Sequence, residues 1–224
     1  MVEMESGTDF GVGIYSVQDS ARLLRRPAAQ IRRWANGYTY RNPAKESVRK
    51  LPVLQSQRGD SGYLNFRELI ELFYVREFTT LGVSLEQVRA VSEKLVSEFG
   101  AYPFASARLL VSGRSLIRVS ELGIISVETC QLVSEIVTPF LQEITFGEEW
   151  AIAWTPAAGN GAVIVDPNFK YGEPILKETG TPTRSVFNLY IKEQDMQRVA
   201  DWFDIQYGRA KDAVEFEMHF SNVA

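Results

Sequence analysis

Apolar residues near the start of the chain recur at the spacing of a short amphipathic helix. In the segment YSVQDSARLL, Val17, Ala21 and Leu24 are four and three residues apart, which places them on one helical face. Ser16 precedes this stripe and has the side chain of a good N-cap, and Asp19 adds a negative charge in the first turn. The pattern predicts a helix that begins next to Ser16 and buries one stripe.

A second short helix is predicted directly afterwards. Pro27 suits the first turn of a helix, where its missing N–H costs nothing, and Gly37 suits the end. The apolar side is formed by Ile31, Trp34 and Ala35. The residues that face away from it are Ala29, Arg32, Arg33 and Asn36, with Gln30 at the border. The two helices and their tight turn predict a helix-turn-helix in which the tryptophan is buried and the arginines are exposed.

Two short apolar runs follow, at residues 51–54 and 63–66, and they flank the polar stretch QSQRGDSG. This arrangement predicts a hairpin with a flexible tip. A hairpin that follows a helix-turn-helix is a wing, and its edge faces the backbone of bound DNA. The cations expected on or beside that edge are Arg41, Lys45, Arg49 and Lys50.

The next two predicted elements are longer helices. Residues 65–82 are apolar around most of the helical circumference, so this helix is expected to be largely buried. The following helix has a complete start signal, because Ser84 and Gln87 have the spacing of a capping box. Its apolar stripe is Val88, Val91, Leu95 and Phe99, and Gly100 ends it.

The rest of the chain mixes strands and helices. Hairpins are predicted for residues 109–111 with 116–119 and for 150–154 with 162–165, and a helix for 131–144. Three short helices are then expected at 183–192, 197–203 (capped by Asp195) and 208–220. The predicted fold class is α+β: a winged helix-turn-helix, a mixed middle region and a C-terminal three-helix unit.

This reading divides the 224 residues into four parts. Residues 1–13 are expected to form a loose tail, short, polar and acidic rather than a signal peptide. The DNA-binding domain is placed at 14–100, a connecting region at 101–161 and a helical domain for dimerisation or partner binding at 162–224. No apolar run approaches the roughly 18 residues of a membrane span, so we expect a cytoplasmic protein.

Positive charge is concentrated in one block of this acidic chain. Residues 21–50 contain nine arginines and lysines and one glutamate, a local net charge of +8, whereas the whole chain carries −4. Such a block is typical of a surface that meets phosphates. A solvated basic face is the plain alternative.

The block supplies the candidate DNA-binding residues. Arg32 and Arg33 suit phosphates or guanine edges, and Gln30 suits an adenine edge. For Arg33 the sequence leaves base reading and phosphate contact open. The remaining candidates are Arg25, Arg26, Tyr38, Arg41, Lys45, Arg49 and Lys50.

Little in the sequence favours catalysis. The single cysteine, Cys130, and the single histidine, His219, do not make a metal site, and His219 is interpreted as a packed or rim residue of an apolar-periodic helix. Glu148 and Glu149 are adjacent, so on a strand they would point to opposite faces. The sequence therefore predicts no catalytic residues, no metal and no cofactor.

The order helix-turn-helix, wing, helix and then LGVSLEQVRAVSEKL resembles the MerR-type winged-helix DNA-binding domain, over about residues 15–99. Two residues depart from that pattern: Arg25 stands where a turn glycine is usual, and Pro27 where a serine or threonine cap is usual. Members of that family dimerise through a long coiled coil. This chain has no sustained heptad pattern, so a different dimerisation device is expected.

The last sixty residues resemble a small domain of VapB-type antitoxins. The pattern D-P-x-x-x-x-G-x-P followed by a threonine and proline is matched by Asp166, Pro167, Gly172, Pro174, Thr179, Pro182 and Thr183. The arginine common in the family motif G-T-R-I-P is absent here, where the chain reads TGTPT. The resemblance implies an antitoxin that represses its own operon and neutralises a toxin, with a PIN-like ribonuclease as the partner.

The charge of the C-terminal helices favours contact with protein over contact with DNA. Residues 201–224 hold five acids and two bases, which makes the last helix a poor DNA reader. The apolar residues expected to form a partner or homodimer interface, or to close the domain's own core, are Trp202, Phe203, Tyr207, Phe216, Met218 and Phe220. An alternative function is an effector-sensing regulator without a toxin, in which Trp150 and Trp154 line a ligand pocket.

Overall fold

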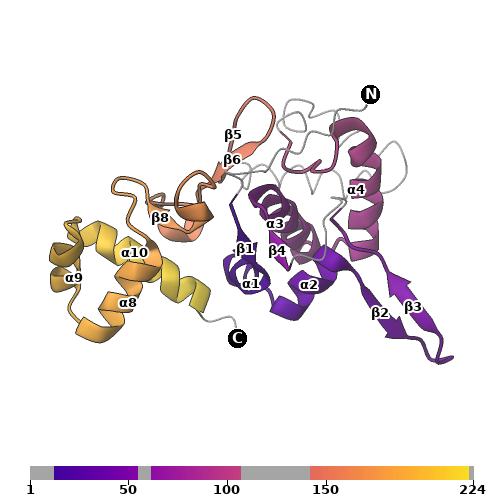
Figure 1. Cartoon of the computed structure of the whole chain (residues 1–224), viewed down its shortest axis with the longest axis horizontal. Coiled ribbons are helices and arrows are strands. Elements are labelled where there is room, and N and C mark those ends of the chain that lie inside the picture. The colour runs from indigo at the N-terminus through magenta and orange to yellow at the C-terminus, as the bar shows by residue number, and fades with distance from the viewer. Residues whose placement is uncertain (1–12, 55–61, 107–141, 222–224) are drawn as a thin grey trace, which may run out of the picture.

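A computed structural model describes residues 13–54, 62–106 and 142–221. In these ranges the chain has an α+β fold of seven α-helices and short antiparallel strand pairs (Figure 1). The described part therefore has the predicted fold class. Several predictions concern residues outside it: the tail up to residue 12, the hairpin at 109–119, the helix from 131 and Cys130.

The first two helices form as predicted. Helix α1 (Val17–Leu24) is capped by Ser16, whose hydroxyl accepts a 3.0 Å hydrogen bond from the Asp19 backbone. Helix α2 (Ala28–Asn36) follows Pro27 and ends at Gly37. The apolar stripes of both helices are buried, including Ile31, Trp34 and Ala35.

The departure at Arg25 has a backbone explanation. Arg25 ends α1 with φ 50° and ψ 49°, the left-handed conformation that glycine usually supplies in such turns. Its N–H is satisfied by the carbonyls of Ala21 and Arg22. The turn between α1 and α2 therefore has the geometry of a glycine turn without a glycine.

The hairpin predicted for residues 51–54 and 63–66 is wrong. The hairpin of this region is β2 (Tyr38–Arg41) paired with β3 (Ser47–Lys50), and its residues are half-buried or exposed. Such strands carry no apolar run, which is why the pattern misplaced them. Residues 51–54 are not a strand: Val53 and Leu54 are buried, and the Val53 N–H donates to the Trp34 carbonyl at 2.8 Å.

The second apolar run, predicted at 63–66, pairs with a different strand and ends earlier than expected. Strand β4 (Tyr63–Leu64) pairs with β1 (Tyr15–Ser16) just before α1. Phe66 is not in the strand, because it is the first residue of helix α3 (Phe66–Thr80). The tip between the two runs, residues 55–61, lies outside the described ranges.

Helices α3 and α4 (Leu85–Phe99) begin at the predicted places. Both have a complete capping box, formed by Asn65 with Glu68 and by Ser84 with Gln87. Helix α3 is buried over most of its surface, as its apolar composition predicts. Helix α4 buries its predicted stripe and ends at Gly100.

The strands around Trp154 differ from the prediction. Strand β6 (Ala151–Trp154) pairs with β5 (Ile144–Phe146), so Ile144 starts a strand and does not end a helix. Strand β6 does not pair as a strand with the segment 162–165, but Trp154 and Val165 form an isolated β-bridge. Strand β7 (Val163–Ile164) pairs instead with β8 (Ile175–Leu176), and the turns Ala157–Gly159 and Lys170–Gly172 are 3₁₀ helices.

The three C-terminal helices lie close to their predicted positions. They are α8 (Thr183–Glu193), α9 (Met196–Phe203) and α10 (Tyr207–Ser221), and the predicted cap Asp195 accepts from the Arg198 backbone. They pack on one another at the far side of the molecule from α4 (Figure 1).

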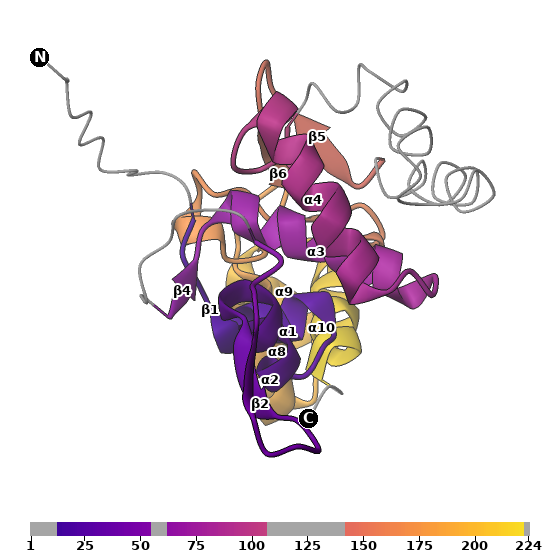
Figure 2. The same ribbon diagram turned by 90° about the vertical axis from the view of Figure 1, so that its right-hand side faces the viewer.

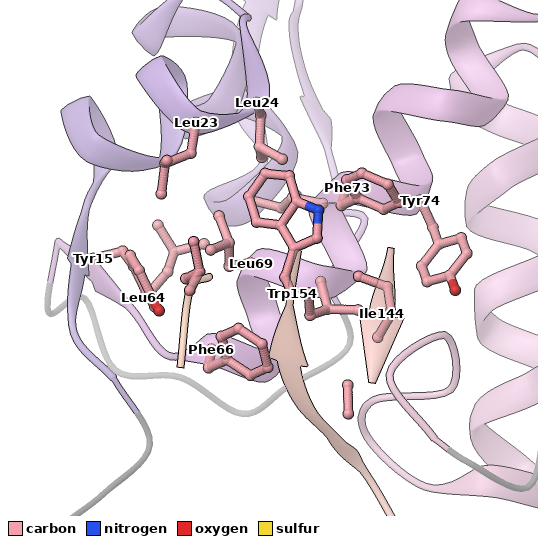
Figure 3. Packing of buried hydrophobic residues seen from close by; sticks show 14 of the residues in the cluster. Tyr15, Leu23, Leu24, Leu64, Phe66, Leu69, Phe73, Tyr74, Ile144 and Trp154 are labelled. Atoms are coloured by element: carbon pink, nitrogen blue, oxygen red, sulfur yellow. The ribbon is translucent and has the colours of Figure 1, made fainter. Parts of the chain in front are cut away.

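Aromatic side chains of α3 meet the strand segment in the core. Trp154 lies against Phe73 with ring centroids 5.4 Å apart (Figure 3). Its indole N–H donates to the Glu143 carboxylate at 3.1 Å, so the polar edge is satisfied. The contact between Phe73 and Trp154 joins α3 to a segment some eighty residues later in the chain.

Stability is expected to fall as pH rises because of Glu71 on α3. The pKa of the Glu71 carboxyl is raised to about 8, mainly by burial and in part by the nearby Glu68 carboxylate, while the hydrogen bond from the Ala105 backbone lowers it. The unfolded chain has a Glu pKa of about 4.3, so the folded state holds the extra proton between these values. The contribution of Glu71 to the free energy of unfolding is therefore fully present at low pH, and it is lost as pH rises towards 8.

The test is urea unfolding between pH 4.5 and 8.5. The variant Glu71→Gln keeps the acceptor for the Ala105 N–H and does not titrate, so it is expected to lose less stability over this range than the wild type. Glu86→Gln, on the exposed surface of α4, is the control and should follow the wild type. Equal pH dependence in wild type and Glu71→Gln would contradict a proton bound at Glu71.

Candidate nucleic-acid interface and partner surface

The outward face of α2 carries two exposed arginines. Arg32 and Arg33 are exposed, and Gln30 beside them is half-buried. Ile31 and Trp34 on the opposite face are buried and fasten the helix to the core. The arginines are therefore available to a ligand on a helix whose position is set by packing.

The β2–β3 hairpin extends this basic surface away from the body of the molecule (Figure 1). Arg41, Lys45 and Arg49 are exposed on it, and Lys50 is half-buried. Lys45 sits in the turn with φ 63°, and the turn is closed by hydrogen bonds between Asn42 and Glu46. The cations predicted for a wing thus lie on a hairpin, although on a different one from that expected.

Helix α2 and the hairpin are held together by direct contacts. The Arg33 guanidinium lies 5.4 Å from the centre of the Tyr38 ring, a cation–π distance. Tyr38 in turn packs near Tyr40, with ring centroids 6.0 Å apart. The ribbons of α2 and β2 also lie next to each other in both views (Figure 1, Figure 2).

Three other cations of the basic block contact the protein itself. Arg22 donates to the Glu217 carboxylate at 2.6 Å, and Arg25 contacts the His219 ring at 3.0 Å. Arg26 donates to the Thr80 hydroxyl at 2.5 Å. Arg25 and Arg26, which are predicted to bind DNA, thus also contact α10 and α3, and Arg25 stays exposed.

His219 is exposed and lies at the rim of α10, where partial burial and the neighbouring Arg25 lower its pKa. This agrees with the interpretation of His219 as a rim residue. The pair Glu148 and Glu149 is exposed in a bend and is not on a strand.

Gly37 is expected to be essential for the junction between α2 and the hairpin. Its φ of 73° and ψ of −174° are accessible only to glycine, and an added Cβ would lie 2.4 Å from the Lys50 carbonyl oxygen. We expect Gly37→Ala to lower the free energy of unfolding by about 3 kcal/mol. Urea denaturation measures this directly.

Gly180→Ala is the matched control for that substitution. Gly180 also has a positive φ, 67°, but an added Cβ there would meet no atom within 4 Å. We expect it to cost about 1 kcal/mol, from backbone strain alone. Equal costs at the two glycines would show that the contact with Lys50 does not constrain the hairpin.

The predicted partner interface is only partly at the surface. Trp202 is 76% exposed, and Tyr207 and Met218 are also exposed, while Phe203 is half-buried. Phe216 and Phe220 are buried and stack on each other at 4.7 Å. For Phe216 and Phe220 the structure therefore favours the second of the two predicted roles, closing the domain's own core.

An open groove runs beside the exposed aromatic residues of the C-terminal helices. It has a volume of about 670 Å³ and is formed by residues of α8, α9 and α10. Tyr207 and Met218 line it, with Lys211 and Glu215 among its polar residues. The C-terminal unit thus offers a hollowed, partly apolar surface far from the basic hairpin.

The pocket predicted around two tryptophans is wrong. Trp154 is 1% exposed and belongs to the core. Trp150 is half-buried under the Arg67 guanidinium, 4.7 Å from the ring centre, and contacts Tyr102 edge-on. Trp154 packs on Phe73 of α3, and its strand pairs with β5.

The described ranges hold neither a metal-binding cluster nor a helix that could span a membrane. Residues 13–54, 62–106 and 142–221 contain no group of three or more His, Cys, Asp or Glu side chains placed to hold a metal ion. Among the helices of those ranges, none has the length and hydropathy needed to cross a membrane.

Comparisons with known proteins find one similar mycobacterial sequence and one similar mycobacterial crystal structure. No protein-family model matches the chain. The chain is 25% identical over 225 residues to the "Putative antitoxin VapB45" of Mycobacterium tuberculosis (strain ATCC 25618 / H37Rv), across 92% of this chain and 94% of that protein. The crystal structure of Rv2018 from Mycobacterium tuberculosis has the same fold, with a TM-score of 0.70 and 22% identity over 89% of this chain and 96% of that chain. The chain is therefore a distant homologue of a protein named as an antitoxin.

Proposed function

We propose that this chain is the antitoxin of a type II toxin–antitoxin pair, which binds its own operator, represses its operon and neutralises a cognate toxin. The full-length similarity to a protein named as an antitoxin supports the toxin–antitoxin role. The resemblance of residues 166–183 to VapB-type antitoxins points to a PIN-like ribonuclease as the toxin.

The observation that carries the DNA-binding part of the proposal is the basic surface of α2 and the β2–β3 hairpin. An exposed helix with Arg32 and Arg33 fits the major groove, where arginine reads guanine or binds phosphate. The adjacent hairpin then serves as the wing, with Arg41, Lys45 and Arg49 on the DNA backbone. Because the rest of the chain is acidic, this surface is the one that a polyanion approaches most favourably.

The C-terminal unit is assigned to protein contacts. Its exposed residues Trp202, Tyr207 and Met218 have the chemistry of interface anchors, and its last helix is acidic. A homodimer built through this unit would place two recognition helices on the two halves of a palindrome. The helices would then be separated by one turn of DNA, about 34–36 Å, or by a multiple of it. The two roles then use opposite ends of the molecule, and neither requires catalysis by this chain.

Co-expression with the product of the adjacent open reading frame tests the antitoxin role. Induction of that product alone is expected to arrest growth, and the wild-type chain is expected to restore it. Arg32→Ala/Arg33→Ala should restore growth equally well, because the DNA surface is separate from the partner surface. Trp202→Ala/Met218→Ala should restore it less well and should co-purify less toxin.

The result that contradicts the antitoxin role is also clear. Failure of the wild-type chain to restore growth and to co-purify with the neighbouring product would remove the toxin partner from the account. DNA binding is tested independently of this result, by operator binding in vitro.

A further inference from the structure

Helix α10 carries two stripes of residues that point in different directions. One stripe is buried and packs on the body of the molecule: Ala210, Ala213, Glu217 and Phe220. The other recurs at intervals of four, three and four residues: Tyr207, Lys211, Val214 and Met218. Alternating intervals of three and four residues are those at which one helix packs along another. The second stripe therefore has the spacing of a helix-packing surface.

This second stripe forms one wall of the open groove of the C-terminal helices. The end of α8 and the start of α9 form the other wall, with Tyr190 and Met196 as its apolar residues. Tyr207 is 51% exposed and Met218 is 42% exposed, while Val214 is buried at the base of the stripe. Helix α10 thus offers apolar contact area on both sides of the middle of the groove.

The charged residues between these apolar positions have opposite signs. Lys211 and Glu215 both line the groove, and their side chains are 58% and 48% exposed. Within the helix they form an i,i+4 pair with a distance of 3.6 Å between Nζ and Oε1. An exposed pair of this kind contributes little to stability. Both side chains are therefore accessible to opposite charges on a partner.

The stripe is complementary to itself when two copies run antiparallel. Tyr207 and Met218 are symmetric about a point between residues 212 and 213, and Lys211 and Glu215 are symmetric about residue 213. Antiparallel copies that cross at this point oppose each tyrosine to a methionine and each lysine to a glutamate, and every contact occurs twice, as in a two-fold interface. Parallel copies would oppose lysine to lysine and glutamate to glutamate, which is repulsive.

We propose that the groove of α8, α9 and α10 is occupied by α10 of a second copy of this chain, in an antiparallel pair that crosses near residue 213. The inference rests on the homodimer of the proposed function and deepens it, because it assigns the residues that form the interface. The Tyr207 ring packs on the Met218 thioether of the partner subunit, a favourable sulfur–aromatic contact. Trp202 does not line the groove, so it remains available to the toxin.

Sedimentation of the purified full chain tests this interface and requires neither DNA nor toxin. At about 50 µM protein, well above a micromolar Kd, the wild type is expected to be a dimer. Lys211→Glu and Glu215→Lys should each raise the Kd about 100-fold or more, because like charges then face each other twice across the pair. Both side chains are exposed, so circular dichroism should show an unchanged helical fold.

Combining the two charge reversals separates this pairing from a general effect of charge. An equimolar mixture of the Lys211→Glu and Glu215→Lys chains should form a heterodimer, because each introduced charge then faces an opposite charge. The double swap Lys211→Glu/Glu215→Lys keeps the net charge of the chain and should restore the homodimer. Lys192→Glu, at an exposed position of α8 outside the groove lining, is the control and should dimerise as the wild type does.

Three outcomes overturn the proposal. A wild type that sediments as a monomer would leave the groove to a different partner. Single variants that dimerise as tightly as the wild type would place the dimer interface elsewhere, and a mixture that stays monomeric would exclude the antiparallel pairing. Failure of the growth-rescue experiment would concern the toxin and would leave the sedimentation results unchanged, so failure of the dimer interface and failure of the antitoxin role are distinguishable.

Discussion

Replacing Glu217 with alanine is expected to lower the free energy of unfolding by about 3–5 kcal/mol, because it removes one partner of a buried ion pair. The Glu217 side chain is 3% exposed and joins Arg22 of α1 to Thr183 of α8. Its loss leaves the Arg22 charge without its 2.6 Å partner, and it leaves the buried Thr183 hydroxyl with the longer bond to the Pro174 carbonyl, 3.3 Å. Urea denaturation followed by circular dichroism measures the change.

Glu215→Ala on the same helix is the control for that substitution. The Glu215 carboxylate is about half exposed and forms an i,i+4 pair with Lys211, 3.6 Å away. Such pairs contribute about 0.3–0.5 kcal/mol, so the control should change stability little. If Glu217→Ala costs no more than Glu215→Ala, α10 does not fasten the N-terminal helices as described. A double-mutant cycle with Arg22→Met isolates the pair itself.

Replacing both Arg32 and Arg33 with alanine is expected to weaken operator binding by about 100-fold at physiological salt. Each arginine that contacts a base or phosphate contributes about 1–3 kcal/mol, and the loss of two phosphate contacts would also reduce the salt dependence by about two. Both side chains are exposed, so the fold should be kept. Loss of the Arg33 contact with the Tyr38 ring should lower stability by about 0.5–1 kcal/mol. Fluorescence anisotropy with the protein's own promoter fragment measures the affinity.

Lys192→Ala/Arg198→Ala removes the same total charge from a different surface. Both residues are exposed on α8 and α9, away from the basic hairpin. This variant should keep nearly all of the operator affinity. If both double variants lose affinity equally, the binding depends on overall charge, and the assignment of α2 as the recognition helix is wrong.

Sequence patterns predicted elements whose signals are local. The caps Ser16, Ser84 and Asp195 each mark a helix start through a bond to the backbone three residues on, and such bonds require no tertiary contact. The buried stripes of α1, α2 and α4 likewise follow from spacing alone. Helix positions and the exposure of Arg32 and Arg33 were therefore accessible from the sequence.

Features set by distant contacts were not accessible. The β2–β3 strands are half-buried or exposed, so they lack the alternation that marks a strand on a core. The bond between Arg22 and Glu217 spans 195 residues, and no local pattern announces it. The buried positions of Phe216 and Phe220 depend on the same tertiary arrangement.

The most direct test of the central claim, that the α2 and hairpin surface binds operator DNA, is a salt series of wild-type binding to the protein's own promoter. If the six cations of this surface each meet a phosphate, the logarithm of the binding constant should fall against the logarithm of salt concentration with a slope of about −5. The six are Arg32, Arg33, Arg41, Lys45, Arg49 and Lys50. A steep slope of this size, reduced by about two in Arg32→Ala/Arg33→Ala, is the predicted result. Absence of binding at low salt, or a slope that the double substitution leaves unchanged, would contradict the account.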